Sequence, residues 1–161
     1  NPFFAIDVFK CLLKNVPNAE YWWVGNGPLE ERVKTYIEEK KLTKYIKLLG
    51  SRNDTVELYQ GMDAFFLPSF FEGLPVTGVE AQAMGLSMVV SDTVTREMVY
   101  TDLVDYVSLN DTPEAWASRL EIALRKNAKR EQYADRLKLS NFSNIGCGNR
   151  LEQVYCWWIN G

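Results

Sequence analysis

Short apolar segments that alternate with helical patterns are the feature that most constrains the fold of this chain. Apolar runs of four or five residues recur, bounded by glycine, proline or polar turns, and apolar residues at helical spacing fill the intervals. We expect strands at 21–24, 45–50, 64–68, 87–92 and 105–109, and helices around 5–12, 29–37, 56–60, 76–84, 96–99 and 113–127. Elements in this order form right-handed crossovers and a parallel sheet with both faces covered. The sequence therefore predicts a doubly wound α/β domain.

The C-terminal part reads as helical throughout. Leu151, Val154, Tyr155 and Trp158 lie on one face of a terminal helix, which we expect to pack back on the domain. No linker, repeat or low-complexity stretch interrupts the chain, and 161 residues with 47% hydrophobic content can bury one core. We therefore expect one domain over residues 1–161.

Charge and cysteine content exclude two classes of site. The net charge is -3 and the 18 basic residues form no block, so the chain lacks the electrostatic footprint of a nucleic-acid binder. Cys11, Cys147 and Cys156 form no C-x-x-C pair, and the chain has no histidine to complete a zinc site. We expect free thiols in a reducing compartment and no bound metal.

The sequence shows no membrane or export signal. No apolar run approaches the ~20 residues that span a bilayer, and the start "NPFFAIDVFK" has no charged n-region or cleavage site. We expect a soluble, cytoplasmic protein. The chain also opens inside a helical pattern, without an initiator methionine or a preceding strand, which suggests a fragment of a longer protein.

The loops that follow the strands are the candidate ligand sites of an open parallel sheet. "VGNGPLEERV" places Gly25 between a strand and a helix, as a phosphate-binding turn does, but G-x-G without a third glycine is more often a tight turn. "LLGSRND" carries Gly50, Ser51 and Arg52, whose backbone groups could meet a base, with Asp54 or the asparagine before it as the next N-cap. A capped surface turn explains this second loop equally well.

The third loop, "SFFEGLPVTGVEAQAMG" at residues 69–85, is the most informative. It places Glu72 on a glycine-broken loop and Glu80 about one turn into the following helix. Backbone N–H groups near the positive end of that helix would form a cradle for an anion, and Pro75 is tolerated at a first helical position. The cradle would consist of the amides of Gly73, Leu74, Val76 and Thr77.

Glu72 and Glu80 suit the two ends of an extended ligand. The helix N-terminus favours an ionised Glu80, whose carboxylate can accept from vicinal hydroxyls such as a ribose diol. Eight residues of helix would separate the carboxylates by about 12 Å. That exceeds the roughly 5 to 9.5 Å between the paired acids of a glycoside hydrolase. The plain alternative is that Glu72 is a surface loop residue and Glu80 complements the helix dipole.

The residues around these glutamates resemble a known family. Nucleotide-sugar-dependent, retaining glycosyltransferases of the GT-B fold carry the motif E-x7-E in their donor-binding half, and this chain matches the motif and its flanks in "PSFFEGLPVTGVEAQAMGLSMVVSD". The resemblance extends over most of the chain through "VGNGPLEE", "IKLLGSRNDTVELYQGMDAFFLPS" and "PEAWASRL". It is nearest to bacterial enzymes of capsular or secreted polysaccharide synthesis, and it implies a Rossmann-like, C-terminal donor domain.

The resemblance implies a role for each matched residue. Glu72, the residue assigned to catalysis, contacts hydroxyls of the transferred sugar as a positioning group, and Glu80 holds the ribose. The amides of Gly73, Leu74 and Val76 face the diphosphate, and the turn from Gly50 to Arg52 lies beside the base. The substrate is a nucleotide-sugar, with a UDP-sugar favoured over a GDP-sugar, and neither a metal nor another cofactor is needed. The sugar moves with retention to a growing polysaccharide or a lipid-linked glycan, while the leaving diphosphate helps to deprotonate the acceptor.

Part of the family's pattern would lie before Asn1. The donor half of the family begins with a strand and a basic pair that clamps the diphosphate, and the acceptor-binding domain precedes both. The resemblance thus implies a donor domain without its N-terminal acceptor domain, inactive alone. The full-length enzyme would associate peripherally with the inner face of the membrane.

Three other functions stay open. A GT-B relative such as a nucleotide-sugar epimerase or a phosphorylase would share the fold, and so would a non-catalytic partner subunit. A nicotinamide dehydrogenase fits less well, because "GNGPLEE" lacks the third glycine and no acidic residue ends the strand "YIKLLG".

Overall fold

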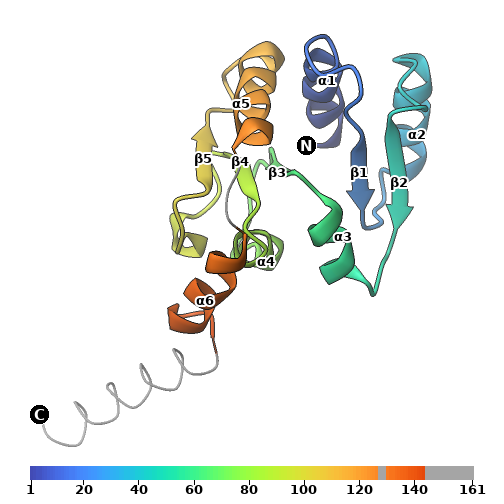
Figure 1. Ribbon diagram of the computed structural model, residues 1–161. Coiled ribbons are helices and arrows are strands. Elements are labelled where there is room, and N and C mark those ends of the chain that lie inside the picture. The colour runs from blue at the N-terminus through green and yellow to red at the C-terminus, as the bar shows by residue number, and fades with distance from the viewer. Residues whose placement is uncertain (127–129, 144–161) are drawn as a thin grey trace, which may run out of the picture.

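The computed structural model describes residues 1–126 and 130–143, as helices that alternate with parallel strands (Figure 1). In chain order the elements are α1 (Pro2–Leu12), β1 (Tyr21–Val24), α2 (Glu30–Glu39), β2 (Ile46–Gly50), α3 (Thr55–Gly61), β3 (Ala64–Leu67), α4 (Val76–Ala83), β4 (Ser87–Ser91), the 3-10 helix η1 (Arg96–Met98), β5 (Val104–Val107), α5 (Pro113–Arg125) and α6 (Glu131–Leu139). This order confirms the predicted α/β fold. The predicted terminal helix with Leu151, Val154, Tyr155 and Trp158 lies outside the described residues.

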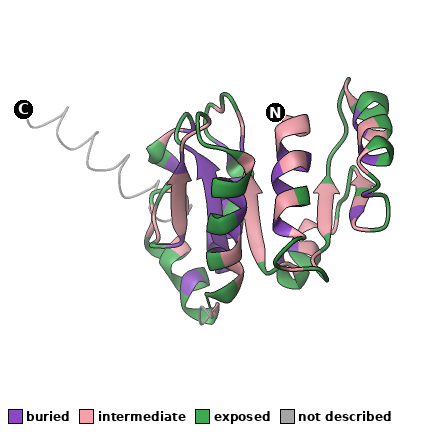
Figure 2. Ribbon diagram, turned by 90° about the horizontal axis from the view of Figure 1, so that it is seen from above, coloured by how far each residue is buried: buried purple, intermediate pink, exposed green. Residues whose placement is uncertain are grey.

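The sheet has two parts, whereas the sequence analysis predicted one parallel sheet. β1 pairs with β2, and β4 pairs with β3 and β5, all in parallel. Every residue of β4 is buried, because it has a strand on each side (Figure 2). β1 and β3 are mostly half-buried, because each has a strand on one side only. The sheet is therefore interrupted between β1 and β3.

Helices cover both faces of the sheet, and two apolar clusters mark the two layers. One cluster joins α1, α2 and α5 to the sheet through Val89, and the other joins α3 and α4 to it through Met88 and Val90. These three neighbours on β4 alternate between the clusters because successive side chains of a strand point to opposite faces. The chain is thus doubly wound, as predicted.

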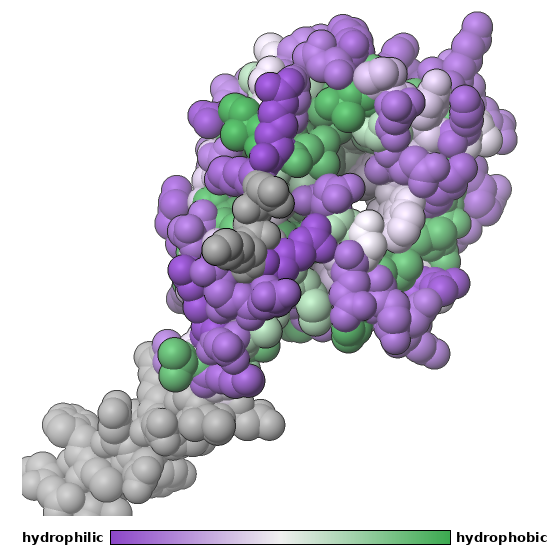
Figure 3. All heavy atoms as spheres, in the orientation of Figure 1, coloured by the Kyte–Doolittle hydropathy of each residue, from purple (hydrophilic) through white to green (hydrophobic). Residues whose placement is uncertain are grey.

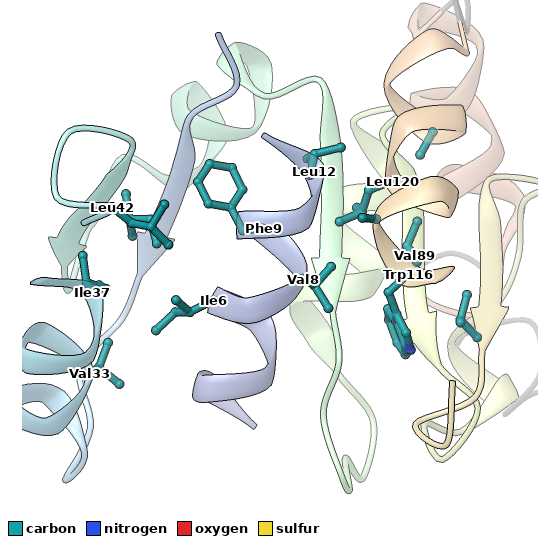
Figure 4. Packing of buried hydrophobic residues seen from close by; sticks show 14 residues of the cluster. Ile6, Val8, Phe9, Leu12, Val33, Ile37, Leu42, Val89, Trp116 and Leu120 are labelled. Atoms are coloured by element: carbon teal, nitrogen blue, oxygen red, sulfur yellow. The ribbon is translucent and has the colours of Figure 1, made fainter. Parts of the chain in front are cut away.

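Helix α1 is the centre of the first layer. Ile6 and Phe9 point from α1 towards the α2 side, while Val8 and Leu12 point towards α5 (Figure 4). Trp116 of α5 is fully buried beside them, and its indole N–H donates to the carbonyl of Ser108, 2.9 Å away. This packing fixes α1 over the interruption of the sheet.

Several predicted bounds differ by a few residues. α2 begins at Glu30, so Pro28 lies before the helix. The N–H of Glu30 donates to the carbonyl of Gly27, which forms a 3-10-like turn ahead of α2. α5 ends at Arg125, and β5 ends at Val107, where the Ser108 carbonyl turns to Trp116. Element ends are the part of a pattern that local propensity fixes least.

Candidate functional site

A cavity of about 1260 Å³ opens along the interruption between β1 and β3. Its walls are the strands Tyr21–Val24 and Ala64–Leu67, and Phe9 of α1 lines it as well. The surface around it is mainly hydrophilic, with hydrophobic residues visible between the polar ones (Figure 3). The cavity exceeds the roughly 300 to 1000 Å³ of a typical small-molecule pocket, so a nucleotide would fill only part of it.

Some of the predicted site residues line this cavity and others lie beside it. Gly25, Gly50, Thr77 and Glu80 belong to its lining, together with Ser69. Outside the lining are Ser51, Arg52, Glu72, Gly73, Leu74 and Val76. The structure thus brings the first two loops and the first turns of α4 to one cavity. The loop with Glu72 reaches the cavity through Ser69, while Glu72 itself lies outside the lining.

The first two loops are joined directly. The N–H of Gly25 donates to the carbonyl of Gly50, 2.7 Å away, and both residues have positive φ, +118° and +64°. Such backbone favours glycine, because a Cβ would clash locally. A Cβ on Gly50 would also lie 3.3 Å from Oδ1 of Asn26. The two glycines therefore allow tight turns, which is the structural alternative that the sequence predicted for these loops.

Arg52 is paired within its own loop. Its Nε donates to Oδ1 of Asp54 at 2.7 Å, and its Nη2 donates to Oδ2 of the same carboxylate. Asp54 stands at the N-cap position of α3, as one of the two residues predicted for it, but its carboxylate binds Arg52 and makes no capping hydrogen bond. This pairing lowers the pKa of Asp54 and keeps the guanidinium beside the loop backbone.

Glu72 is half-buried and held by a residue that the sequence analysis did not single out. Ser69 donates its hydroxyl to Oε1 of Glu72, 2.7 Å away. The carbonyl of Ser69 accepts hydrogen bonds from Ser91, the last residue of the neighbouring strand β4, and from Thr93 in the loop after it. The loop that carries Glu72 is thus tied to the next loop of the same sheet edge. A serine three residues before Glu72 was visible in the sequence, but these partners were not.

The N-terminus of α4 has unpaired donors. The N–H groups of Gly78 and Val79 donate to the carbonyl of Pro75, while those of Val76 and Thr77 find no acceptor among residues 1–126 and 130–143. Val76 and Thr77 are exposed, as are Gly73 and Leu74 in the loop before them. A Cβ on Gly73 would meet nothing within 4 Å. Two of the four amides predicted for the anion cradle thus have no acceptor among the described residues, and the cradle itself stays a prediction.

Glu80 is exposed at the mouth of the cavity, and one of its oxygens is engaged. Tyr59 of α3 donates its hydroxyl to Oε2 of Glu80, 3.0 Å away. In the part of the chain that the structure describes, no group donates to Oε1 of Glu80. The sequence predicts Tyr59 only as a residue of a helix, since nothing in the local pattern places it beside a residue 21 positions away.

The described residues hold no group of three histidine, cysteine or acidic side chains that could bind a metal ion, and no helix among them could cross a bilayer. Cys11 is a free thiol, and burial together with the nearby Glu114 raises its pKa. Cys147 and Cys156 lie outside the described residues.

Comparison with known proteins identifies relatives of this chain. It is 36% identical over 95 residues to the UDP-Gal:alpha-D-GlcNAc-diphosphoundecaprenol alpha-1,3-galactosyltransferase of Escherichia coli, a match that covers 57% of this chain and 24% of that enzyme. The chain spans less than a third of the length of the first curated relatives that it matches.

Solved structures share the fold. A glycosyltransferase from Rickettsia africae aligns with a TM-score of 0.75 at 26% identity, covering 98% of this chain and 45% of that one. A variant of S. aureus TarM, solved with fondaparinux, alpha-GlcNAc-glycerol and UDP, aligns with a TM-score of 0.77 at 16% identity, over 98% of this chain and 31% of that one. The predicted GT-B type of Rossmann-like fold is thereby confirmed.

The family model for "Glycosyl transferases group 1" matches residues 1–139, which include both parts of the sheet and all the loops at its carboxyl edge. The chain therefore belongs to the group 1 glycosyl transferases.

Proposed function

We propose that this chain is the donor-binding domain of a retaining glycosyltransferase that takes its sugar from a nucleotide-sugar, with a UDP-sugar favoured over a GDP-sugar. The observation that carries the proposal concerns the first turns of α4: Oε1 of Glu80 and the N–H groups of Val76 and Thr77 have no partner among the described residues. A carboxylate oxygen that can accept from a hydroxyl, together with N–H groups that can bind an anion, matches a ribose joined to a diphosphate. The Escherichia coli relative is named for a UDP-Gal donor, which supports the choice of nucleotide.

Each loop has one role in the proposed complex. Glu80 accepts a hydrogen bond from a ribose hydroxyl, and the amides at the start of α4 bind the diphosphate. The joined turns of Gly25 and Gly50 close the nucleoside end of the cavity, with Arg52 beside the base. Glu72, held by Ser69, is left for the hydroxyls of the sugar.

The chemistry proposed for the site is stabilisation of the leaving diphosphate. Charge builds up on the diphosphate as the bond to the sugar breaks, and N–H groups already aimed at it lower the barrier without reorganisation. Glu72 positions the sugar and is not assigned as a nucleophile. Retention would follow from reaction on one face of the sugar, with the leaving diphosphate helping to deprotonate the glycan or lipid-linked acceptor.

The same proposal accounts for the interrupted sheet. We assign the space between β1 and β3 to a strand that precedes Asn1 in a longer protein, together with a basic pair for the diphosphate and an acceptor domain. α1 supports this assignment, because it runs back to the start of β1 and so begins at the carboxyl edge, where a parallel strand in the gap would end. A location at the inner face of the membrane stays a prediction from the sequence.

Hydrogen exchange tests the strand assignment. The N–H of Tyr21 donates to the carbonyl of Tyr45, directly before β2, and that of Gly25 donates to Gly50 in β2. The N–H groups of Trp22 and Val24 therefore point into the gap. In the 161-residue chain these two amides should exchange faster than that of Trp23. An N-terminal extension with four consecutive valines should slow them, while the same extension with two prolines should not. Equal protection of Trp22, Trp23 and Val24 without any extension would contradict the assignment.

Two glutamate variants test the donor site. Glu80→Gln should weaken UDP binding by about 1.5 to 3 kcal/mol, the usual worth of a hydrogen bond to a charged group. Glu72→Gln should leave UDP binding unchanged and weaken binding of UDP-galactose or UDP-N-acetylglucosamine. Chemical-shift titration with UDP, GDP and ADP measures both effects and identifies the base. An unchanged UDP affinity in Glu80→Gln would refute the site.

A further inference from the structure

Tyr59 is the one tyrosine among the described residues whose hydroxyl donates to a glutamate of the proposed donor site. The side chain belongs to α3, and its hydroxyl lies 3.0 Å from Oε2 of Glu80 and 3.3 Å from the carbonyl of Thr77 in α4. The residue is only 7% exposed, and its ring packs at 6.3 Å from that of Phe65. A buried ring thus donates its hydroxyl to an exposed carboxylate.

The hydrogen bond is not required to satisfy Glu80. An exposed carboxylate can be hydrated by water, and most such side chains sample several rotamers. Tyr59 limits that freedom by its hydrogen bond to Oε2, and Oε1 has no donor among the described residues and can accept from a ligand. Burial first, and then the negative charge of Glu80, raise the pKa of Tyr59, so the phenol stays a donor across the neutral range.

The contact also connects two loops of the site. α3 begins at Thr55, directly after the loop that carries Gly50 and Arg52, and α4 begins directly after the loop that carries Glu72. The hydrogen bond from Tyr59 to Glu80 therefore joins the helix behind the proposed base subsite to the helix of the proposed ribose subsite.

We propose that Tyr59 is a positioning residue, which holds the carboxylate of Glu80 in the orientation that accepts a hydroxyl of the nucleotide ribose. This rests on the donor-binding role proposed for Glu80. Tyr59 touches no substrate itself. Its contribution is to order the Glu80 side chain before the ligand arrives, so that the entropy cost of ordering this side chain does not reduce the binding affinity.

A double-mutant cycle on the 161-residue chain tests this inference. Tyr59→Phe keeps the ring and removes the hydroxyl, and it should weaken UDP binding about three- to tenfold, the cost of ordering one flexible side chain on binding. In a Glu80→Ala background the same change should have no further effect, because no side chain is left at this position for Tyr59 to orient. Chemical-shift titration with UDP gives the four dissociation constants, and thermal unfolding gives the four stabilities.

Tyr100→Phe is the matched control. The hydroxyl of Tyr100 donates to the carbonyl of Val79 in α4 at 2.9 Å, so this change also removes a half-buried phenol hydrogen bond to the same helix. It should lower stability by a similar amount and leave UDP affinity unchanged. A second ligand, 2′-deoxy-UDP or 3′-deoxy-UDP, should be less sensitive to Tyr59→Phe than UDP is, for whichever hydroxyl Glu80 accepts.

The possible results separate the inference from the proposed function. If Glu80→Gln weakens UDP binding and Tyr59→Phe does not, the positioning role is refuted and the donor site stands. If Tyr59→Phe weakens binding equally with and without the Glu80 carboxylate, Tyr59 acts through the packing of α3 and the positioning role is again refuted. If Glu80→Gln has no effect, the donor site itself is refuted.

Discussion

Replacing Gln82 by leucine should destabilise the protein severely, because Gln82 is a fully buried polar link between α4 and the segment after β4. Its Nε2 donates to the carbonyls of Gly78 and Met98, at 3.1 and 2.9 Å. Its Oε1 accepts from the N–H of Tyr100 at 3.2 Å and the hydroxyl of Thr101 at 2.9 Å. Both ends of the amide are thus satisfied.

Leucine has a similar size but makes none of these bonds. The carbonyl of Met98 and the N–H of Tyr100 would then lose their partner, and a buried group left unpaired costs about 1 to 3 kcal/mol. Gly78 is less affected, since its carbonyl lies within α4 and can accept in the helix ladder. The sum is about 2 to 6 kcal/mol, which is a large share of the roughly 5 to 15 kcal/mol that stabilises a typical domain.

Urea unfolding followed by tryptophan fluorescence measures the loss. Gln60→Leu is the control, because Gln60 is exposed on α3 and its backbone carbonyl, which accepts from Arg130, is unchanged by the substitution. We expect Gln60→Leu to change stability by less than about 0.5 kcal/mol. A loss below about 1 kcal/mol in Gln82→Leu would show that the two backbone groups find other partners, and would refute the reasoning.

Three further outcomes are expected. Gly85→Ala should lower the unfolding free energy, measured in urea, by at least about 1 kcal/mol, because Gly85 has φ +69° and an added Cβ would lie 2.7 Å from Cα of Arg130. Gly27→Ala is the control and should cause no such loss, because a Cβ on Gly27 meets nothing within 4 Å. The pKa of Asp102 is lowered by its own backbone N–H and then by Arg136. Its contribution to the unfolding free energy is therefore present above about pH 4 and is lost as the pH falls further. Asp102→Asn should flatten that part of a pH–stability curve. UDP should bind the 161-residue chain no tighter than about 0.1 to 1 mM in titration calorimetry, with no sugar transfer, and micromolar binding with turnover would show a complete site.

The elements of this fold were predictable because each has a strong local signal. The strand YWWV ends at Gly25, where positive φ stops it, and the helix after Pro113 starts at a cap that Thr112 provides. Such signals involve residues a few positions apart. The link from Tyr59 to Glu80 and the link from Ser69 to Ser91 each span more than 20 positions, so no local pattern contains them.

The interruption of the sheet was not predicted, yet the strand sequences agree with it. The two outer strands carry a charge, Lys47 in β2 and Asp105 in β5, as exposed edges do to avoid pairing with other chains. The edges that face the gap carry none, since β1 reads YWWV and β3 reads AFFL. Uncharged, continuously apolar strands of this kind are typical of the interior of a parallel sheet, where both neighbours are strands. The placement of charged residues therefore distinguishes the two outer strands of this sheet, which carry a charge, from the two strands that face its gap, which carry none.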